Sequence, residues 1–156
     1  METKKVDWQL VILVCSIIII MIMGVRQSLG LFLEPITNFM NSGKEFFSFA
    51  IGVQAIIWGL VTFFLGILID KFGPQKVLAF GIISFASGIF LMSNPTSEFT
   101  LFSATTLMGF GLGGAGMATM VSIAGKVAPV NKRSLGMGLV AAAASFGQFA
   151  VVLPVM

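Results

Sequence analysis

One arginine lies inside a run of apolar residues that is as long as a membrane span. The stretch from Trp8 to Leu33 is almost entirely apolar, yet Arg26 stands within it. Ionisable residues inside membrane spans are rare, and they commonly mark the path of a substrate or an ion. The guanidinium group presents its donors as a rigid fork that matches a carboxylate. Arg26 is therefore a candidate binding group for an organic anion.

Two positions of this arginine fit the sequence. Arg26 follows Trp8 by 18 residues, or about 27 Å of helix, so its side chain can reach the outer headgroups of a core about 30 Å thick. Alternatively, the helix is longer than the bilayer and tilted, and Arg26 faces a water-filled cavity. The polar neighbours Gln27 and Ser28, followed by further apolar residues, favour the cavity.

Two glutamines are the other candidate binding residues. Gln54, Trp58 and Thr62 are spaced by four, so they share one face of a helix. Polar groups that face hydrocarbon are costly, so Gln54 and Thr62 are predicted to face protein or a wet cavity. Gln148 stands alone on a face of small residues. Hydrogen bonding between helices, without any ligand, is the alternative role for both glutamines.

The composition defines the class of protein that positions these groups. The chain has 156 residues, of which 57% are hydrophobic and 10% charged, whereas soluble domains carry about 25% charged residues. The fold class is therefore an all-α polytopic membrane protein. No histidine and a single cysteine, Cys15, are present, so no metal site, cofactor or disulfide framework is expected. With no catalytic pair or phosphate loop either, we predict neither an enzyme nor a nucleic-acid partner.

Five transmembrane helices are predicted, separated by segments rich in turn residues. Their ranges are 8–33, 46–69, 77–92, 100–124 and 135–155. Cationic residues predict the orientation, because they concentrate in cytoplasmic loops. Seven fall on the side of the N-terminus, which is therefore predicted to be cytoplasmic: Lys4, Lys5, Lys71, Lys76, Lys126, Lys132 and Arg133. After five crossings the C-terminus would lie outside.

Glycines mark faces where helices are predicted to pack closely. Gly52, Gly59 and Gly66 are spaced by seven residues, which keeps them on one face. Gly109 and Gly113 form G-x-x-x-G in the fourth helix. Small residues of this kind allow two helix backbones to approach each other in lipid.

The same stretch also matches the nucleotide-binding pattern G-x-G-x-x-G, through Gly109, Gly111 and Gly114. That pattern indicates a dinucleotide site only between a strand and a helix, with an acidic residue about 20 positions later. Here it lies inside an apolar run of helix length, and residues 130–138 contain no acid. We therefore interpret it as a packing face.

The turn between the second and third helices carries the most specific signal. Asp70 falls at the C-terminal end of a helix, where the backbone dipole disfavours a negative charge by about 0.3–1 kcal/mol. A nearby cation or the N-terminus of another helix would compensate. Asp70 is therefore predicted to make a contact between helices at the cytoplasmic side, one that can break and re-form.

This turn resembles the signature G-x-x-x-D-[RK]-x-G-x-[RK]-[RK] of the major facilitator superfamily of secondary transporters. The chain matches it at Gly66, Asp70, Lys71, Gly73 and Lys76. Gln75 departs from it, because a cation usually stands there. The resemblance implies that these residues form a cytoplasmic gate, and that Gln75 weakens it.

The resemblance extends over all 156 residues, which correspond to helices one to five of twelve and so to part of an N-terminal six-helix half. Residues 24–36, 58–74 and 132–149 look most like the branch of monocarboxylate and oxalate/formate carriers. That branch keeps a substrate-orienting cation near the position of Arg26. A frequent arginine of the fourth helix is replaced by Thr105, which puts proton coupling through it in doubt.

We therefore expect a secondary active transporter of the cell membrane that works by alternating access on a small organic anion, such as a monocarboxylate. Arg26, Gln54 and Gln148 would bind the substrate, and a proton or counter-anion would be coupled to it. A C-terminal half or partner chain would complete the path. Two alternatives stay open: a short or truncated membrane protein that packs against a partner without transporting, and an efflux or sugar carrier with a neutral or cationic substrate.

Overall fold

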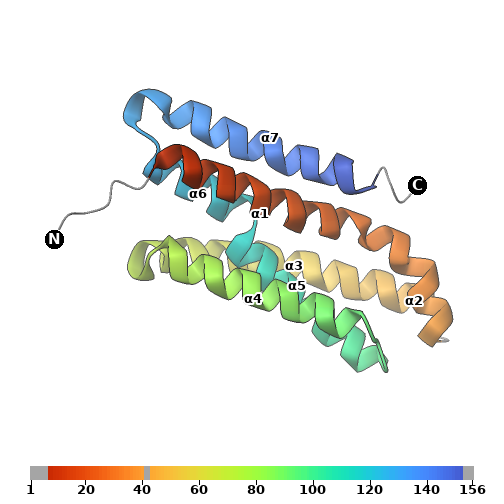
Figure 1. Ribbon diagram of the computed structural model, residues 1–156. Helices are drawn as coiled ribbons and strands as arrows, with labels where there is room; N and C mark the ends of the chain where they lie inside the picture. Colours follow the sequence, from red (N-terminus) through yellow and green to blue (C-terminus); the bar gives the residue numbers. More distant parts are fainter. Residues whose placement is uncertain (1–6, 41–42, 153–156) are drawn as a thin grey trace.

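The computed structural model describes residues 7–40 and 43–152, except the side chains of residues 151 and 152. These ranges are helical and contain no strand (Figure 1). The α-helices are α1 (Trp8–Ser28), α2 (Leu33–Met40), α3 (Lys44–Phe72), α4 (Pro74–Met92), α5 (Glu98–Ala115), α6 (Met117–Val127) and α7 (Arg133–Val152). Two short 3-10 helices, η1 (Leu29–Phe32) and η2 (Val130–Lys132), connect neighbouring helices.

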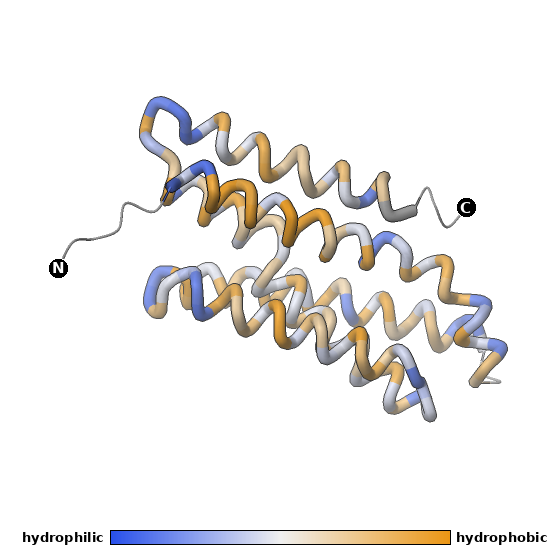
Figure 2. The backbone as a smooth tube through the Cα atoms, in the orientation of Figure 1, coloured by the Kyte–Doolittle hydropathy of each residue, from blue (hydrophilic) through white to orange (hydrophobic). Residues whose placement is uncertain are grey.

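The helices form five long segments, as the sequence predicted. The first three are α1–η1–α2 together, α3 and α4; the fourth is α5 with α6, and the fifth is α7. In the described part of the chain, the first four are long and apolar enough to cross a membrane. Figure 2 shows apolar residues along the middle of the segments and polar residues at both ends. The all-α polytopic class is confirmed.

The first segment is longer than the sequence indicated. It continues past Leu33 to Met40, into the segment 34–45 that we interpreted as a break because it is rich in turn residues. Pro35 lies in the first turn of α2, where a proline removes no backbone hydrogen bond. The Thr37 hydroxyl also donates to the Leu33 carbonyl at 2.7 Å. The proline therefore begins a new helical turn instead of ending the segment.

The turn between α3 and α4 is as tight as its Gly-Pro sequence indicates. Gly73 has a φ of +86°, and its N–H donates to the Ile69 carbonyl at 3.1 Å. Pro74 follows as the first residue of α4, so this helix begins three residues before the predicted Val77. The turn therefore fixes the signature residues at one end of the bundle.

We expect Gly73→Ala to destabilise the protein by about 1–2 kcal/mol, because an L-residue disfavours positive φ. No heavy atom lies within 4 Å of a Cβ placed there, so the strain is conformational and not steric. Asn tolerates positive φ better, and Gly73→Asn is the matched control. Thermal unfolding in detergent is the measurement, and equal melting temperatures for the two variants would contradict this explanation.

The fourth segment is interrupted, which the sequence did not indicate. Gly116 has extended backbone angles (φ −79°, ψ −173°) and separates α5 from α6. The Thr119 hydroxyl donates at 3.2 Å to the Gly113 carbonyl, one of those left without a partner by the interruption. The fourth helix, predicted as one helix over 100–124, is therefore two helices joined near the middle of the span.

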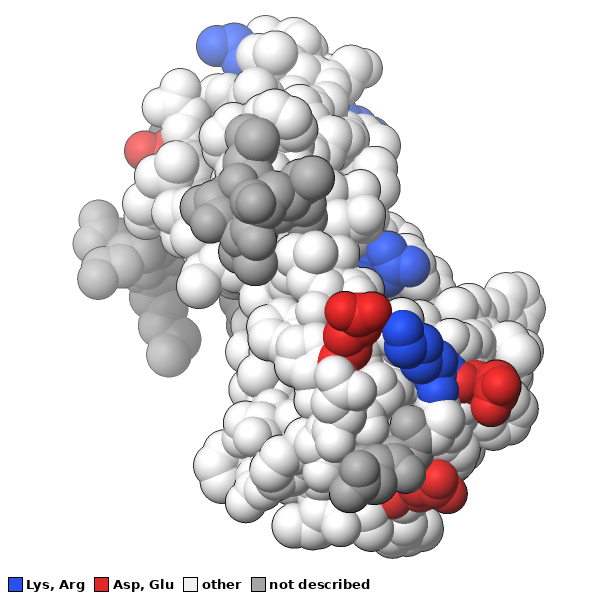
Figure 3. Space-filling model, turned by 90° about the vertical axis from the view of Figure 1, so that its right-hand side faces the viewer, with Lys and Arg blue, Asp and Glu red and all other residues white. Residues whose placement is uncertain are grey.

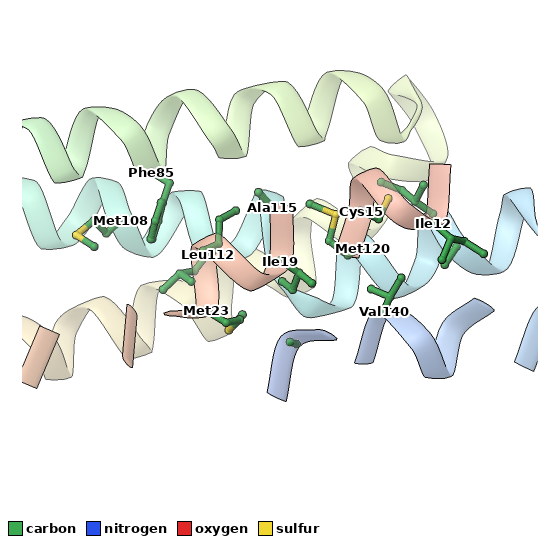
Figure 4. Packing of buried hydrophobic residues seen from close by; sticks show 14 of the residues in the cluster. Ile12, Cys15, Ile19, Met23, Phe85, Met108, Leu112, Ala115, Met120 and Val140 are labelled. Carbon is green, nitrogen blue, oxygen red and sulfur yellow. The ribbon is translucent and has the colours of Figure 1, made fainter. Parts of the chain in front are cut away.

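Because of the interruption, the two halves of the fourth segment pack in two different layers of helices. α5 packs mainly on α3 and α4, whereas α6 packs on α1 and α7 (Figure 1). The core lies where the layers meet, and Figure 4 shows labelled side chains there from α1, α4, α5, α6 and α7. Ile19, Leu112, Met120 and Val140 are almost completely buried in this core.

Glycines allow the closest contacts between helices. On one face of α5, a Cβ at Gly111 would lie 2.7 Å from the Phe85 Cα of α4. On another face, a Cβ at Gly109 would lie 2.9 Å from the Gln54 carbonyl oxygen of α3, and Gly113 contacts Val61 of the same helix. The glycine-rich stretch therefore packs α5 between two neighbours.

The glycine face predicted for α3 is different. A Cβ added at Gly52, Gly59 or Gly66 would meet no heavy atom within 4 Å in the described part of the chain. These glycines therefore pack no helix of the ranges 7–40 and 43–152, and close packing along this face stays a prediction.

Candidate substrate-binding site

A cavity of about 380 Å³ lies between the first segment and α3. The first segment contributes Arg26 and Gln27, and α3 contributes Ser48, Gln54 and Trp58. Apolar side chains, including Leu112 of α5, complete the wall. The cavity therefore combines a few polar groups with an apolar lining, as small-molecule sites commonly do.

Arg26 lies on the wall of this cavity, roughly halfway along the first segment. It follows Trp8 by 18 residues and precedes Met40 by 14, which correspond to about 27 Å and 21 Å of helix. The helix beyond Arg26 argues against a role as an anchor at the headgroups. The side chain is half-buried.

The Arg26 guanidinium group packs against an aromatic ring. The guanidinium carbon lies 4.7 Å from the centre of the Trp58 ring, a cation–π distance. Within the described residues, no carboxylate oxygen lies within 4 Å of its nitrogens. The ring orients the guanidinium group but leaves its charge uncompensated, which suits an anionic ligand.

Gln54 is the second polar group of the cavity. Its side chain is only 3% exposed, and its amide nitrogen has no hydrogen-bond partner in the described part of the chain. A buried donor without a partner costs about 1–3 kcal/mol, and such groups are rare in native proteins. The neighbouring close contact with Gly109 fixes this part of α3 against α5. The Gln54 amide is thus a buried donor at the wall of the cavity, and no described residue supplies its partner.

A second hollow, of about 610 Å³, lies farther along α3. It is lined by Thr62 of α3 and by Met117, Ala118 and Val121 of α6. The two hollows share Ala55 and Trp58. The face predicted from Gln54, Trp58 and Thr62 therefore borders hollows along its length.

Gln148 is not part of this arrangement. It is half-buried on α7 and does not line the cavity of Arg26 and Gln54. Its neighbour Gly147 contacts the backbone of Ile20 on α1. The structure thus brings together two of the three predicted binding residues, and a binding role for Gln148 stays a prediction.

An ion pair joins two segments at one end of the bundle. The Lys126 ammonium of α6 donates to the Asp70 carboxylate of α3 at 3.0 Å, and both side chains are largely exposed. Asp70 therefore makes a contact between helices, as the sequence indicated. Its partner was missed, because Lys126 lies 56 residues away and outside the signature. The signature lysine Lys71 instead lies 5.4 Å from the Phe72 ring.

A second ion pair lies at the opposite end. Lys44 of α3 and Glu34 of α2 are 3.1 Å apart. Figure 3 views this end, where acidic and basic side chains gather on an otherwise uncharged face. Both ion pairs connect α3 to another segment, and the cavity of Arg26 and Gln54 lies between them along the helix.

The comparisons with known proteins agree with this architecture. The family model described as Major Facilitator Superfamily matches residues 12–156. Over 98 residues the chain is 29% identical to an uncharacterized MFS-type transporter, YcxA, of Bacillus subtilis (strain 168). The aligned region is 63% of this chain but only 23% of that relative. No solved structure matches the chain at a significant level.

The family match includes the described helices that carry Arg26, Gln54 and the Asp70–Lys126 pair. It also accounts for the long apolar segments and the signature turn at 66–76. Because the match covers nearly the whole sequence, the chain belongs to the Major Facilitator Superfamily of membrane transporters.

Proposed function

We propose that the protein is a secondary carrier of a small organic anion in the cell membrane, with Arg26 as the residue that binds the carboxylate. One observation carries the proposal. Arg26 has no acidic partner among the described residues, and it shares a cavity with the buried, unpaired amide of Gln54. An anion bound to Arg26 would also accept a hydrogen bond from the Gln54 amide once that side chain turns toward the cavity.

The cavity favours a small, partly apolar anion. Its volume of about 380 Å³ is near the lower end of the range for small-molecule sites, about 300–1,000 Å³. Leu29, Ile51 and Leu112 line the same cavity and provide apolar contacts. A short aliphatic carboxylate, such as a monocarboxylate, fits this combination. A proton or a counter-anion would be the coupled species.

The two ends of the bundle support alternating access as the mechanism. Among the described residues, the end with Asp70 and Lys126 carries most of the cations. By the positive-inside rule, this supports a cytoplasmic location for that end and for the N-terminus. Exposed ion pairs contribute little stability and break readily. The Asp70–Lys126 pair, together with the turn at 66–76, would serve as a gate, and substrate would bind near mid-membrane.

The direct test is uptake of labelled short-chain carboxylates into vesicles that contain the full-length protein, compared with a neutral sugar and an organic cation. Saturable uptake of a carboxylate, with no uptake of the other two, is expected. If only the neutral or the cationic compound is transported, the proposal of an anionic substrate is wrong. If the purified full-length protein transports none of the three, the proposed function as a carrier is wrong. Substitution of Arg26 then connects activity to the cavity.

We expect Asp70→Asn and Lys126→Gln to alter transport more than stability. The pair is exposed, so each change should lower the free energy of unfolding by no more than about 1 kcal/mol. Loss of the gate contact should shift the balance of states, and so change the maximal rate of uptake by about threefold or more. Melting temperatures and uptake rates are the measurements.

The charge-swapped protein, Asp70→Lys with Lys126→Asp, is the matched control, because it restores a pair of reversed polarity. Recovery of the uptake rate would identify the pair itself as the cause. Equal rates for both single variants and the unchanged protein would contradict a role in gating.

A further inference from the structure

We infer that Trp58 is a positioning residue that closes the passage between the two hollows along α3, and that Arg26 holds its ring in place. This inference rests on the proposed function, since a closed passage matters only where a substrate crosses. The observation is the position of one indole ring. Trp58 lines the cavity of Arg26 and Gln54, and it also lines the hollow of Thr62 and Met117.

The ring extends across the space between α3 and two other segments. One face lies under the Arg26 guanidinium of α1, 4.7 Å from the guanidinium carbon. The indole nitrogen lies 3.4 Å from the position of a Cβ at Gly116, where α5 and α6 meet. Trp58 thus contacts the first segment with its face and the interruption of the fourth segment with its edge. These contacts place the ring between the hollows.

Arg26 and Gly116 have separate effects on this ring. The cation–π contact favours one orientation of the indole, and it is strengthened when water is scarce. Gly116 has no side chain, so the nitrogen edge can lie directly against the backbone. A carboxylate bound to Arg26 would draw the guanidinium group from the ring and free the indole to move. Substrate binding and opening of the passage would then be coupled through one contact.

The test measures access of a reagent and does not require a known substrate. Cys15 and any cysteine of the full-length protein outside this sequence are first replaced by alanine. A cysteine is then introduced in one hollow as Ser48→Cys or in the other as Thr62→Cys. A membrane-impermeant, charged thiosulfonate is added to intact cells, on the proposed outer side. Ser48→Cys should react rapidly. Thr62→Cys should react slowly while Trp58 is present.

Removal of the ring should open the passage. We expect Trp58→Ala to raise the labelling rate of Thr62→Cys by about tenfold. A change of this size corresponds to the free energy of one cation–π contact. Arg26→Gln should raise it in the same direction, because the ring loses its cation. Trp58→Phe, which keeps an aromatic ring, is the matched control and should stay slow. Ser48→Cys should label equally in all backgrounds, which shows that the outer cavity is intact.

Two results would overturn the inference. One is rapid labelling of Thr62→Cys with Trp58 in place; the other is an unchanged rate after Trp58→Ala. If Trp58→Ala loses the Ser48→Cys reaction and so has misfolded, Trp58→Leu takes its place with the same expectation. If the protein shows this labelling pattern but takes up no carboxylate, the inference that Trp58 closes the passage stands. The proposed substrate is then wrong.

Discussion

Replacing Arg26 by Gln is expected to reduce the uptake of small carboxylates by about 100-fold or more. The fork of Arg26 can make two charged hydrogen bonds to a carboxylate, each contributing about 1.5–3 kcal/mol, and glutamine offers only neutral ones. A loss of about 3 kcal/mol corresponds to a factor of about 100. Uptake kinetics of full-length protein in vesicles, normalised to the amount in the membrane, is the measurement.

The substitution series for Arg26 separates charge from geometry. Arg26→Lys keeps the charge but loses the fork, so uptake should be intermediate, with a loss of about tenfold. Lys44→Gln is the matched control, because it removes a cation that is paired with Glu34 at the surface and lies outside the cavity. We expect it to change uptake by less than about twofold.

One outcome for Arg26→Gln would contradict the proposal. If this variant is folded and takes up carboxylates at an undiminished rate, Arg26 does not bind the substrate. Because Arg26 contacts Trp58, the melting temperature of each variant must be measured alongside its uptake. A collapse of folding in Arg26→Gln but not in Arg26→Lys would indicate a structural role for the charge instead.

Much of the fold could be predicted because the bilayer restricts what the sequence can do. Long apolar runs separated by Pro, Gly and Asn predict helices that span a membrane. The described part of the chain has five long helical segments, and the first four are long and apolar enough to do so. The interruption at Gly116 could not be predicted in this way. Glycine changes hydropathy little, and a glycine-rich stretch that packs closely looks the same in sequence as one that breaks a helix.

The candidate site could be predicted in part, because each polar residue inside an apolar run is conspicuous by itself. Arg26 and Gln54 were identified in this way, and they line one cavity. In the sequence, Gln148 looked like an equivalent candidate to Arg26 and Gln54. The periodicity of a helix, however, does not show which neighbouring helix each of its faces contacts. The contact of Arg26 with Trp58 depends on how α1 and α3 are arranged, and the sequence specifies that only through the whole fold.

The packing of α5 carries the second large effect that we expect. Gly111→Ala should lower the free energy of unfolding by about 3 kcal/mol, because overpacking a core commonly costs about 1–3 kcal/mol and can cost more. The added Cβ would lie 2.6 Å from the backbone nitrogen of Phe85 and 2.7 Å from its Cα. These are backbone atoms, so no change of rotamer relieves the overlap, and α4 and α5 must separate.

Thermal unfolding of the full-length protein in detergent measures this effect, and Gly138→Ala is the matched control. Gly138 lies on α7, and no heavy atom lies within 4 Å of a Cβ placed there in the described part of the chain. Alanine is favoured over glycine in a helix by about 1 kcal/mol, so this control should be neutral or slightly stabilising.

If both variants melted alike, the close approach of α4 and α5 at Gly111 would be wrong. If Gly111→Ala alone is destabilised, the contact between the two helices is as close as described. Because that contact sets the position of α5, it also sets the wall that α5 contributes, through Leu112, to the cavity of Arg26 and Gln54.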